Sequence, residues 1–388
     1  WLVERQTQPS RRRGGGVRTI RRLIYGEVFI AVGFVLIAFL SLFFFFDFVD
    51  ELTSLGRRSR LDPQVTYELR HALLYVALLI PSRIYELMPI AVLIGSVFVL
   101  ARLAQGSEYT ILRTSGLGPW RALRALLGLG AIFVVLTFAI GDYLAPLSDR
   151  TAQLLKARFE GRISVGQTGA WLKERQTYSN FSVNVGSMTP RGELADIRIF
   201  EFDNHGFLVS TMQAKSGQIE ADAVWTLRQV VRREFDTAGL SSAHINRVTQ
   251  DTLRWESGLS TEMVSVALLR PDRMRTADLF AYIQHLDANN QTAQRYEIEF
   301  WRKVFYPLSC LVMVVLALPF AYLHFRSGAL TGYVFGGVMI GISFFLLNNV
   351  FGYIGNLNEW RPWLAAASPA LIYTFMSLGA FGWLVLRR

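Results

Sequence analysis

The sequence predicts an α-helical membrane protein with six transmembrane helices, three before and three after an inserted all-β domain. Three observations predict this class. Hydrophobic residues make up 52% of the 388-residue chain and charged residues only 18%, whereas about a quarter of a soluble chain is charged. Apolar runs long enough to cross a bilayer occur in both end regions of the chain. Between them, residues 147–300 contain no such run and hold nearly equal numbers of basic and acidic residues.

Six apolar runs are interpreted as membrane spans. A bilayer core of about 30 Å requires about 20 apolar residues in a helix, and six buried soluble helices of this length in one chain would be improbable. The first run is too long for a signal peptide, and no small-residue cleavage site follows it, so it is a permanent span. The predicted spans are 24–46, 84–101, 125–141, 304–323, 330–351 and 362–386.

The remaining segments complete the predicted organisation. Residues 71–80 form an apolar stretch too short to span alone, which either lies at the membrane interface or lengthens a tilted second helix. The N-terminal residues, with an arginine run and a triple glycine, are interpreted as a flexible leader or a remnant of an expression vector. The predicted division is a leader (1–19), spans one to three (20–146), a β domain with a linker helix (147–300) and spans four to six (301–388).

Arginines beside the spans predict the orientation, because basic residues are enriched in cytoplasmic loops. Most of them lie on one side if six spans alternate, which places the β domain outside the cytoplasm. The outer loop after span one is an exception, with Arg57, Arg58, Arg60 and Arg70, followed by Arg83 at the start of span two. Interleaved acids are consistent with a salt-bridged loop. The alternative is a cationic rim that holds an anionic lipid headgroup.

Short alternating segments predict the β domain. Phe181, Val183 and Val185 fall on one face of a strand, and the segment 195–202 changes its alternation in a way that indicates a bulge. Turns are expected at 189–193, 203–206 and 215–217. Many short strands at this spacing predict a sandwich or jelly roll. A short helix is expected from Thr276, as N-cap, to Leu286.

Few residues indicate enzymatic chemistry. The single cysteine, Cys310, excludes an internal disulfide, and no Gly-Lys dipeptide is present for a phosphate-binding loop. The five histidines are scattered, and neither HExxH nor GxSxG occurs, so no metal site and no catalytic residue is expected. Glu86 and Asp142 lie at the outer ends of spans, which favours interfacial carboxylates, and Glu86 could pair with Arg83 on one helix face.

Two further motifs each have two interpretations. Gly328, Gly332 and Gly336 repeat at four-residue spacing in span five, and Gly337 pairs with Gly341. Such small residues allow close helix packing, which is either static or belongs to a helix that slides at a gate. After span two, residues 107–116 predict a short helix with Glu108 in its first turn. This helix is either a connecting turn or a docking element for a cytoplasmic partner.

These features together resemble the LptF/LptG permease family. The resemblance rests on six spans with a β insert after the third, on LARLAQGSEYTILRTSG after span two, and on EFWRKVFYPLSCLVMVVLALPF at 299–320. It covers nearly the whole chain from about residue 20 and is closer to the LptG branch of the family. One departure is Asp47, where relatives in that branch can have a lysine.

The resemblance implies a transport subunit in the inner membrane of Gram-negative bacteria. It would pair with an LptF-like permease and be driven by two copies of the ATPase LptB, which hold ATP and Mg, so the chain itself needs no cofactor. It would extract lipopolysaccharide and pass it to periplasmic LptC and LptA. Residues 107–116 would be the coupling helix, with Glu108 and Arg113, and spans one and five would line lateral gates. Basic residues would contact the lipid phosphates: Arg57, Arg58, Arg83, Lys156 and Arg158.

Extracting such a lipid is uphill by about 0.8 kcal/mol for each CH₂ group that leaves the bilayer. A chain without a nucleotide-binding loop therefore requires a partner ATPase. A multi-pass enzyme acting on a lipid headgroup and a membrane scaffold remain alternatives. The basic charge belongs to the membrane-flanking segments, which argues against nucleic acid as the partner.

Overall fold

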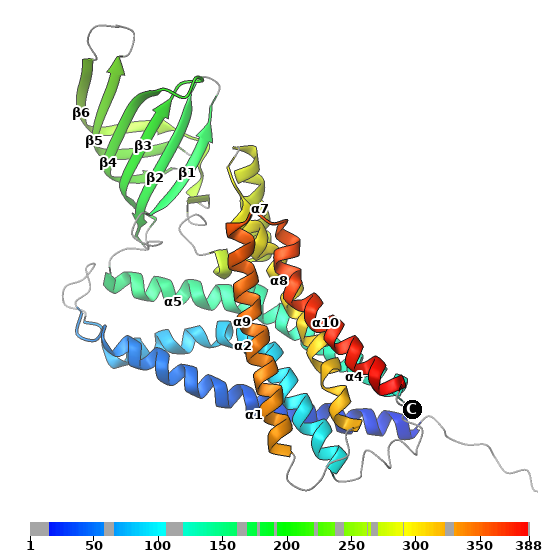
Figure 1. The fold of residues 1–388 in the computed structure, drawn as a ribbon. Coiled ribbons are helices and arrows are strands. Elements are labelled where there is room, and N and C mark those ends of the chain that lie inside the picture. The colour runs from blue at the N-terminus through cyan, green and yellow to red at the C-terminus, as the bar shows by residue number, and fades with distance from the viewer. Residues whose placement is uncertain are drawn as a thin grey trace, which may run out of the picture.

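The computed structural model describes residues 15–57, 66–105, 119–160, 169–176, 179–189, 192–220, 224–236, 244–261, 263–264, 271–289, 291–322 and 330–386. Within these residues, six helices are long and apolar enough to cross a membrane. A six-stranded antiparallel sheet is inserted between the third and fourth of them (Figure 1). The predicted fold class, a six-helix membrane bundle with an inserted β domain, is thus confirmed.

The spanning helices extend past the apolar runs, because polar residues continue each helix beyond the hydrocarbon layer. The stretch 71–80 belongs to the second helix, which runs on through Pro81 and Pro89. Figure 1 shows this helix bent along its length, as internal prolines cause. The helices are α1 (Gly15–Leu52), α2 (Leu69–Gln105), α4 (Pro119–Ala139), α5 (Ala145–Glu160), α8 (Gln294–Leu316), α9 (Leu330–Leu357) and α10 (Pro362–Leu386).

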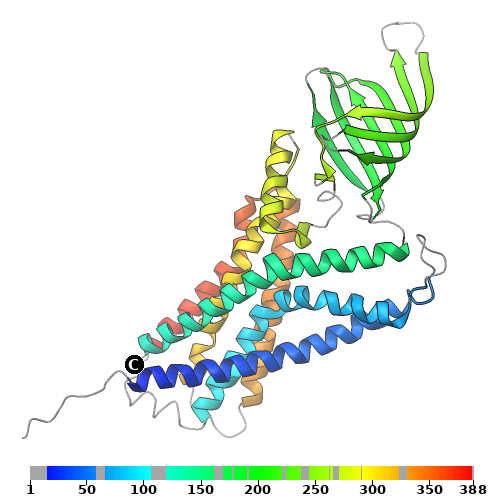
Figure 2. The same cartoon turned by 180° about the vertical axis from the view of Figure 1, so that it is seen from behind.

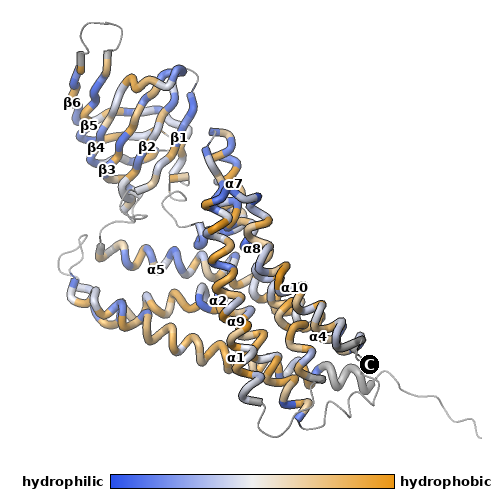
Figure 3. The backbone as a smooth tube through the Cα atoms, in the orientation of Figure 1, coloured by the Kyte–Doolittle hydropathy of each residue, from blue (hydrophilic) through white to orange (hydrophobic). Residues whose placement is uncertain are grey.

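The bundle opens toward the β domain. Helix α4 packs against α8, and the π-helix η1 (Ile140–Leu144) continues it into α5, which runs alongside α2 to one side. Helices α8, α9 and α10 rise on the other side (Figure 2). Helix α2 is the most buried, since it contacts α1, α5, α8 and α9. Figure 3 shows hydrophobic residues along most of α1, α2, α9 and α10, with hydrophilic residues concentrated on α5 and the sheet.

The sheet consists of six strands joined in chain order, each antiparallel to the next. A sandwich, one of the two folds that the strand spacing predicted, would have connections that cross between sheets, and the six strands joined in chain order have none. The predicted turns at 189–193 and 203–206 lie between strands. The strands are β1 (Ala170–Arg175), β2 (Asn180–Met188), β3 (Leu194–Phe202), β4 (Leu208–Ile219), β5 (Val224–Asp236) and β6 (His244–Glu256).

The inner face of the sheet forms a separate hydrophobic core. Phe181, Val183 and Val185 are buried together as predicted, and the expected irregularity in β3 occurs between Glu201 and Phe202. The predicted turn at 215–217 is wrong, because β4 continues through it. Gly217 is needed there because a Cβ would lie 2.7 Å from Ile197 Cδ1, so the glycine permits close packing and does not mark a turn.

Helix α7 (Thr276–Ala288) connects the two parts of the chain. Its residues Tyr282, Ile283 and Leu286 belong to the core of the sheet. The predicted N-cap at Thr276 is wrong: Arg275 takes the cap position without a side-chain hydrogen bond. Thr276 instead donates to Asp142 of η1, from its backbone N over 2.7 Å and from Oγ1 over 2.6 Å. A carboxylate from the membrane bundle therefore satisfies the N-terminus of this helix.

Candidate functional site

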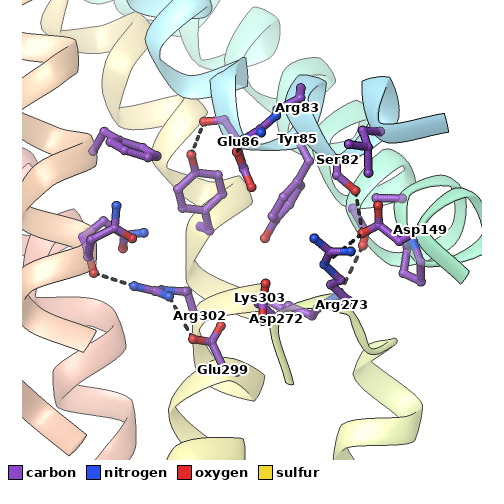
Figure 4. Close-up of a pocket in the computed structure, with 18 of the residues that line it drawn as sticks. Ser82, Arg83, Tyr85, Glu86, Asp149, Asp272, Arg273, Glu299, Arg302 and Lys303 are labelled. Carbon is purple, nitrogen blue, oxygen red and sulfur yellow. Dashed lines mark hydrogen bonds and ion pairs between the residues drawn. The ribbon is translucent and has the colours of Figure 1, made fainter. Parts of the chain in front are cut away.

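A polar cavity of about 510 Å³ lies where the two sides of the bundle diverge. Side chains from α2, α5, α8, α9 and the short 3-10 helix η3 (Pro271–Arg273) line it (Figure 4). The basic side chains are Arg83, Arg273, Arg295, Arg302 and Lys303, and the acidic ones are Glu86, Asp149, Asp272 and Glu299. Charged side chains between apolar helices raise the free energy of the folded protein unless they are paired with each other or bind a ligand.

Lys303 of α8 is buried, and the local backbone geometry of the third span provides its hydrogen-bond acceptor. Its Nζ donates to the carbonyl oxygen of Gly141 over 3.2 Å. That carbonyl lacks its usual helical donors: the Ala145 N–H is used by Ile140 in the π-helical register, and the next residue, Pro146, has no N–H. The lysine supplies the missing donor and joins α8 to the third span.

Arg302, the neighbour of Lys303, joins α8 to α9. Its Nη1 donates to Glu299 Oε1 over 2.8 Å and its Nη2 to the carbonyl oxygen of Asn348 over 2.6 Å. This approach requires Gly352, because a Cβ there would lie 2.7 Å from the guanidinium Nη2. The arginine is thereby fixed at the cavity wall.

Asp149 of α5 forms the opposite wall. Its Oδ2 accepts a hydrogen bond from Ser82 of α2 over 2.8 Å and lies 4.0 Å from Nε of Arg273. Its Oδ1 is buried and has no hydrogen-bond partner within the described residues. Figure 4 shows Asp149, Ser82 and Arg273 converging on one side of the cavity, with Arg302 and Glu299 facing them.

Two of the predicted phosphate-binding residues are held by carboxylates of α1. Arg83 donates from Nη2 and Nε to Asp47, over 2.8 and 3.1 Å, and from Nη1 to Glu86 over 3.2 Å. The Arg83–Glu86 pair was predicted from the sequence and is confirmed. Lys156 of α5 donates to Glu51 over 3.1 Å and lies 4.8 Å from the ring centre of Tyr75.

The other predicted site residues are placed less completely. Arg57 is exposed just beyond α1, where its carbonyl accepts a hydrogen bond from the Tyr67 N–H over 2.8 Å. Arg158 lies on α5, and the structure describes only its backbone. Four predicted residues lie outside the described residues: Arg58, Glu108, Arg113 and Gly328.

The glycines of α9 face two directions. Gly337 and Gly341 face α2, and a Cβ on Gly341 would lie 2.9 Å from Ile90 Cγ2. A Cβ on Gly332 or Gly336 would meet nothing within 4 Å. Neither glycine packs closely against the described part of the chain, and the packing or gating role predicted for Gly332 and Gly336 stays a prediction.

The sequence interpretation did not assign roles to Ser82 or to most of the charged residues that line the cavity: Asp149, Asp272, Arg273, Arg295, Glu299, Arg302 and Lys303. A signal existed for Arg302 and Lys303. They are adjacent cations that immediately precede the predicted span 304–323 and fall inside the observed helix α8, and ionisable residues within a spanning helix are candidates for function. No signal in the sequence placed η3 beside α5 and α8.

The fold and the cavity define a class of protein: a multi-span membrane protein with a charged cavity between its helices, below a β domain. Comparison with known proteins identifies the class more closely. The profile of the family described as "Lipopolysaccharide export system permease LptF/LptG" matches residues 22–387. The chain therefore belongs to the LptF/LptG family.

Individual relatives agree with this family. The chain is 28% identical to the lipopolysaccharide export system permease protein LptG of Escherichia coli strain K12 over 370 residues, which cover 95% of this chain and 98% of the relative. It is also 28% identical to LptG of Haemophilus influenzae over 375 residues, which cover 96% and 99%. The similarity spans all six helices and the sheet, so it supports the predicted kinship with the LptG branch.

Proposed function

We propose that this chain is a lipopolysaccharide export permease, a multi-pass subunit of the inner membrane, and that it works in an ATP-driven transporter. The observation that carries the proposal is the charged cavity between apolar helices in a chain that matches the family along nearly its whole length. Lipopolysaccharide combines several acyl chains with a phosphorylated sugar headgroup. Apolar helix faces suit the first part, and the arginines, lysine and asparagines of the cavity suit the second.

The partners follow from the energetics of the task. Withdrawal of acyl chains from a bilayer is uphill by about 0.8 kcal/mol for each CH₂ group, so an external energy source is required. In the proposed complex an LptB-like ATPase dimer binds ATP and Mg and engages the segment 107–116. An LptF-like permease completes the lipid cavity. The β domain lies in the periplasm and passes the lipid to LptC and LptA.

In this proposal the basic residues near the outer ends of spans one to three contact the lipid phosphates. Arg83 already lines the cavity, and Lys156 lies beside α1 through its contact with Glu51. Arg57, Arg58 and Arg158 would extend the same cationic surface. A guanidinium binds a phosphate with two parallel hydrogen bonds, which suits such a rim.

The test is affinity purification of the tagged chain in mild detergent, followed by mass spectrometry of both proteins and lipids. A second permease, an ATPase and bound lipopolysaccharide are the expected companions. Purification from a membrane rich in lipopolysaccharide that yields only ordinary phospholipid and no ATPase would contradict the proposal. Turnover of a lipid by the chain alone would favour the enzyme alternative.

A further inference from the structure

The outer end of α1 carries two carboxylates one helical turn apart, and each binds a cation from a different helix. Asp47 binds Arg83 of α2, and Glu51 binds Lys156 of α5. Residues four apart lie on the same face of a helix. One face of α1 thus holds both neighbouring helices by ion pairs.

The carboxylates are more deeply buried than the cations they hold. The side chain of Glu51 is 6% exposed and that of Lys156 is 31% exposed, while Asp47 is 18% and Arg83 30% exposed. Arg83 also lines the charged cavity, whereas Asp47 does not. An anion that enters from the cavity would therefore meet the cation first, with the carboxylate behind it.

Each guanidinium nitrogen of Arg83 donates one hydrogen bond to a carboxylate. Nε and Nη2 donate to Asp47, and Nη1 donates to Glu86. A phosphate can form the side-on two-point contact with Nε and Nη2 of Arg83 only by replacing Asp47. At Lys156 a phosphate would compete with Glu51 for the same ammonium charge, and Glu51 Oε1 is buried without a hydrogen-bond partner in the described residues.

We propose that Asp47 and Glu51 form an acidic clasp that determines substrate specificity by competing with lipid phosphates for Arg83 and Lys156. A phosphodiester lipid such as phosphatidylglycerol carries one negative charge, as the carboxylate does, so its exchange for Asp47 gains little. A phosphomonoester carries up to two charges and three strong acceptor oxygens, as phosphorylated side chains do. It can displace the carboxylate, so the clasp excludes abundant monoanionic phospholipids and admits lipids with phosphomonoesters.

The inference rests on the proposed function, because it assumes that lipid phosphates reach these two cations. It adds that the selectivity comes from acids of this chain in addition to the basic rim. Because phosphate and the α1 carboxylates compete for the same two cations, the linkage is reciprocal: a bound phosphomonoester weakens the attachment of α1 to α2 and α5.

The experiment measures binding of two probes, lipopolysaccharide and phosphatidylglycerol, to the purified membrane complex in detergent. Asp47→Asn keeps the shape of the side chain and removes its charge. We expect it to raise the affinity for phosphatidylglycerol about tenfold, equivalent to about 1.4 kcal/mol. Its affinity for lipopolysaccharide should change by less than about threefold, so the preference for lipopolysaccharide falls. Glu51→Gln should act in the same direction.

Three controls make the result specific. Asp50→Asn removes a neighbouring charge from an exposed position of α1 whose carboxylate forms no ion pair within the described residues. It should leave the preference unchanged. Asp47→Glu should retain the preference, since it keeps the charge. In an Arg83→Gln background, Asp47→Asn should have no further effect on phosphatidylglycerol binding, which a general loss of folding would not reproduce.

An unchanged preference in Asp47→Asn and Glu51→Gln, in a wild type that selects lipopolysaccharide, would overturn the clasp and leave the proposed function intact. An equal change in Asp50→Asn would also overturn it, since the effect would then be one of general surface charge. A wild type that binds lipopolysaccharide no better than phosphatidylethanolamine would overturn the proposed function itself.

Discussion

The contact between Asp142 and the N-terminus of α7 leads to a sharp prediction. One carboxylate oxygen accepts two hydrogen bonds from Thr276, 2.7 and 2.6 Å long. Hydrogen bonds to charged groups contribute about 1.5–3 kcal/mol each, and neutral ones about 0.5–1.5. Asp142→Asn therefore costs about 2 kcal/mol in the attachment of α7, including the lost attraction to the helix N-terminus.

Hydrogen–deuterium exchange of the full chain measures this loss. A change of about 2 kcal/mol corresponds to about 30-fold faster exchange wherever local opening of α7 limits the rate. The first turn of α7 should respond, while the buried strands β2 and β3 should not. Asp278→Asn is the matched control, because Asp278 is an exposed acid in the same turn and forms no ion pair or hydrogen bond with the third span within the described residues.

Two results would refute this reasoning. Exchange in α7 that is unchanged in Asp142→Asn would mean that the carboxylate does not tie the β domain to the bundle. Equal acceleration in Asp142→Asn and Asp278→Asn would mean that the effect is only loss of negative charge near a helix N-terminus.

Four further predictions concern other parts of the chain. Gly341→Leu should destabilise the bundle by about 1–3 kcal/mol, because a side chain there meets Ile90. Gly336→Leu should change the stability of the separate chain by less than about 1 kcal/mol and weaken only a contact with a second chain, as thermal unfolding and co-purification would show. Burial lowers the pKa of His285, so the neutral form is favoured in the folded state. The contribution of neutral His285 to the free energy of unfolding is complete above about pH 6.5 and is lost as the pH falls toward the lowered pKa. The melting temperature of His285→Gln should therefore fall less steeply from about pH 7 to about pH 5 than that of the wild type. An identical slope in the two proteins would contradict this. Glu108→Ala should weaken ATPase association, and wild-type assembly with wild-type lipid-stimulated ATPase activity would count against a coupling role for 107–116.

Some features of this protein are local, and these could be predicted from the sequence. A membrane span depends on the hydropathy of one contiguous segment, so all six were located, although their polar extensions were not. Alternation in β2 depends on the pleat of a single strand, so the buried face of Phe181, Val183 and Val185 was correctly identified. The Arg83–Glu86 ion pair could be predicted because its two residues lie one helical turn apart.

Other features depend on contacts between distant segments, and the structure alone decided these. Gly217 looked like a turn residue because the close approach of Ile197 to it is invisible in sequence. The burial of Lys303 is explained only by the Gly141 carbonyl, which the π-helix η1 and the following proline leave without a backbone donor.

The clasp shows the same division at the proposed site. The sequence by itself determined that this is a six-span membrane protein with an inserted β domain and an excess of arginine near the membrane. Only the tertiary structure decided that Asp47 lies on the guanidinium of Arg83, 36 residues away in the chain. The physical reason is that charge on a side chain is a local property, whereas its neutralisation depends on which helices pack together.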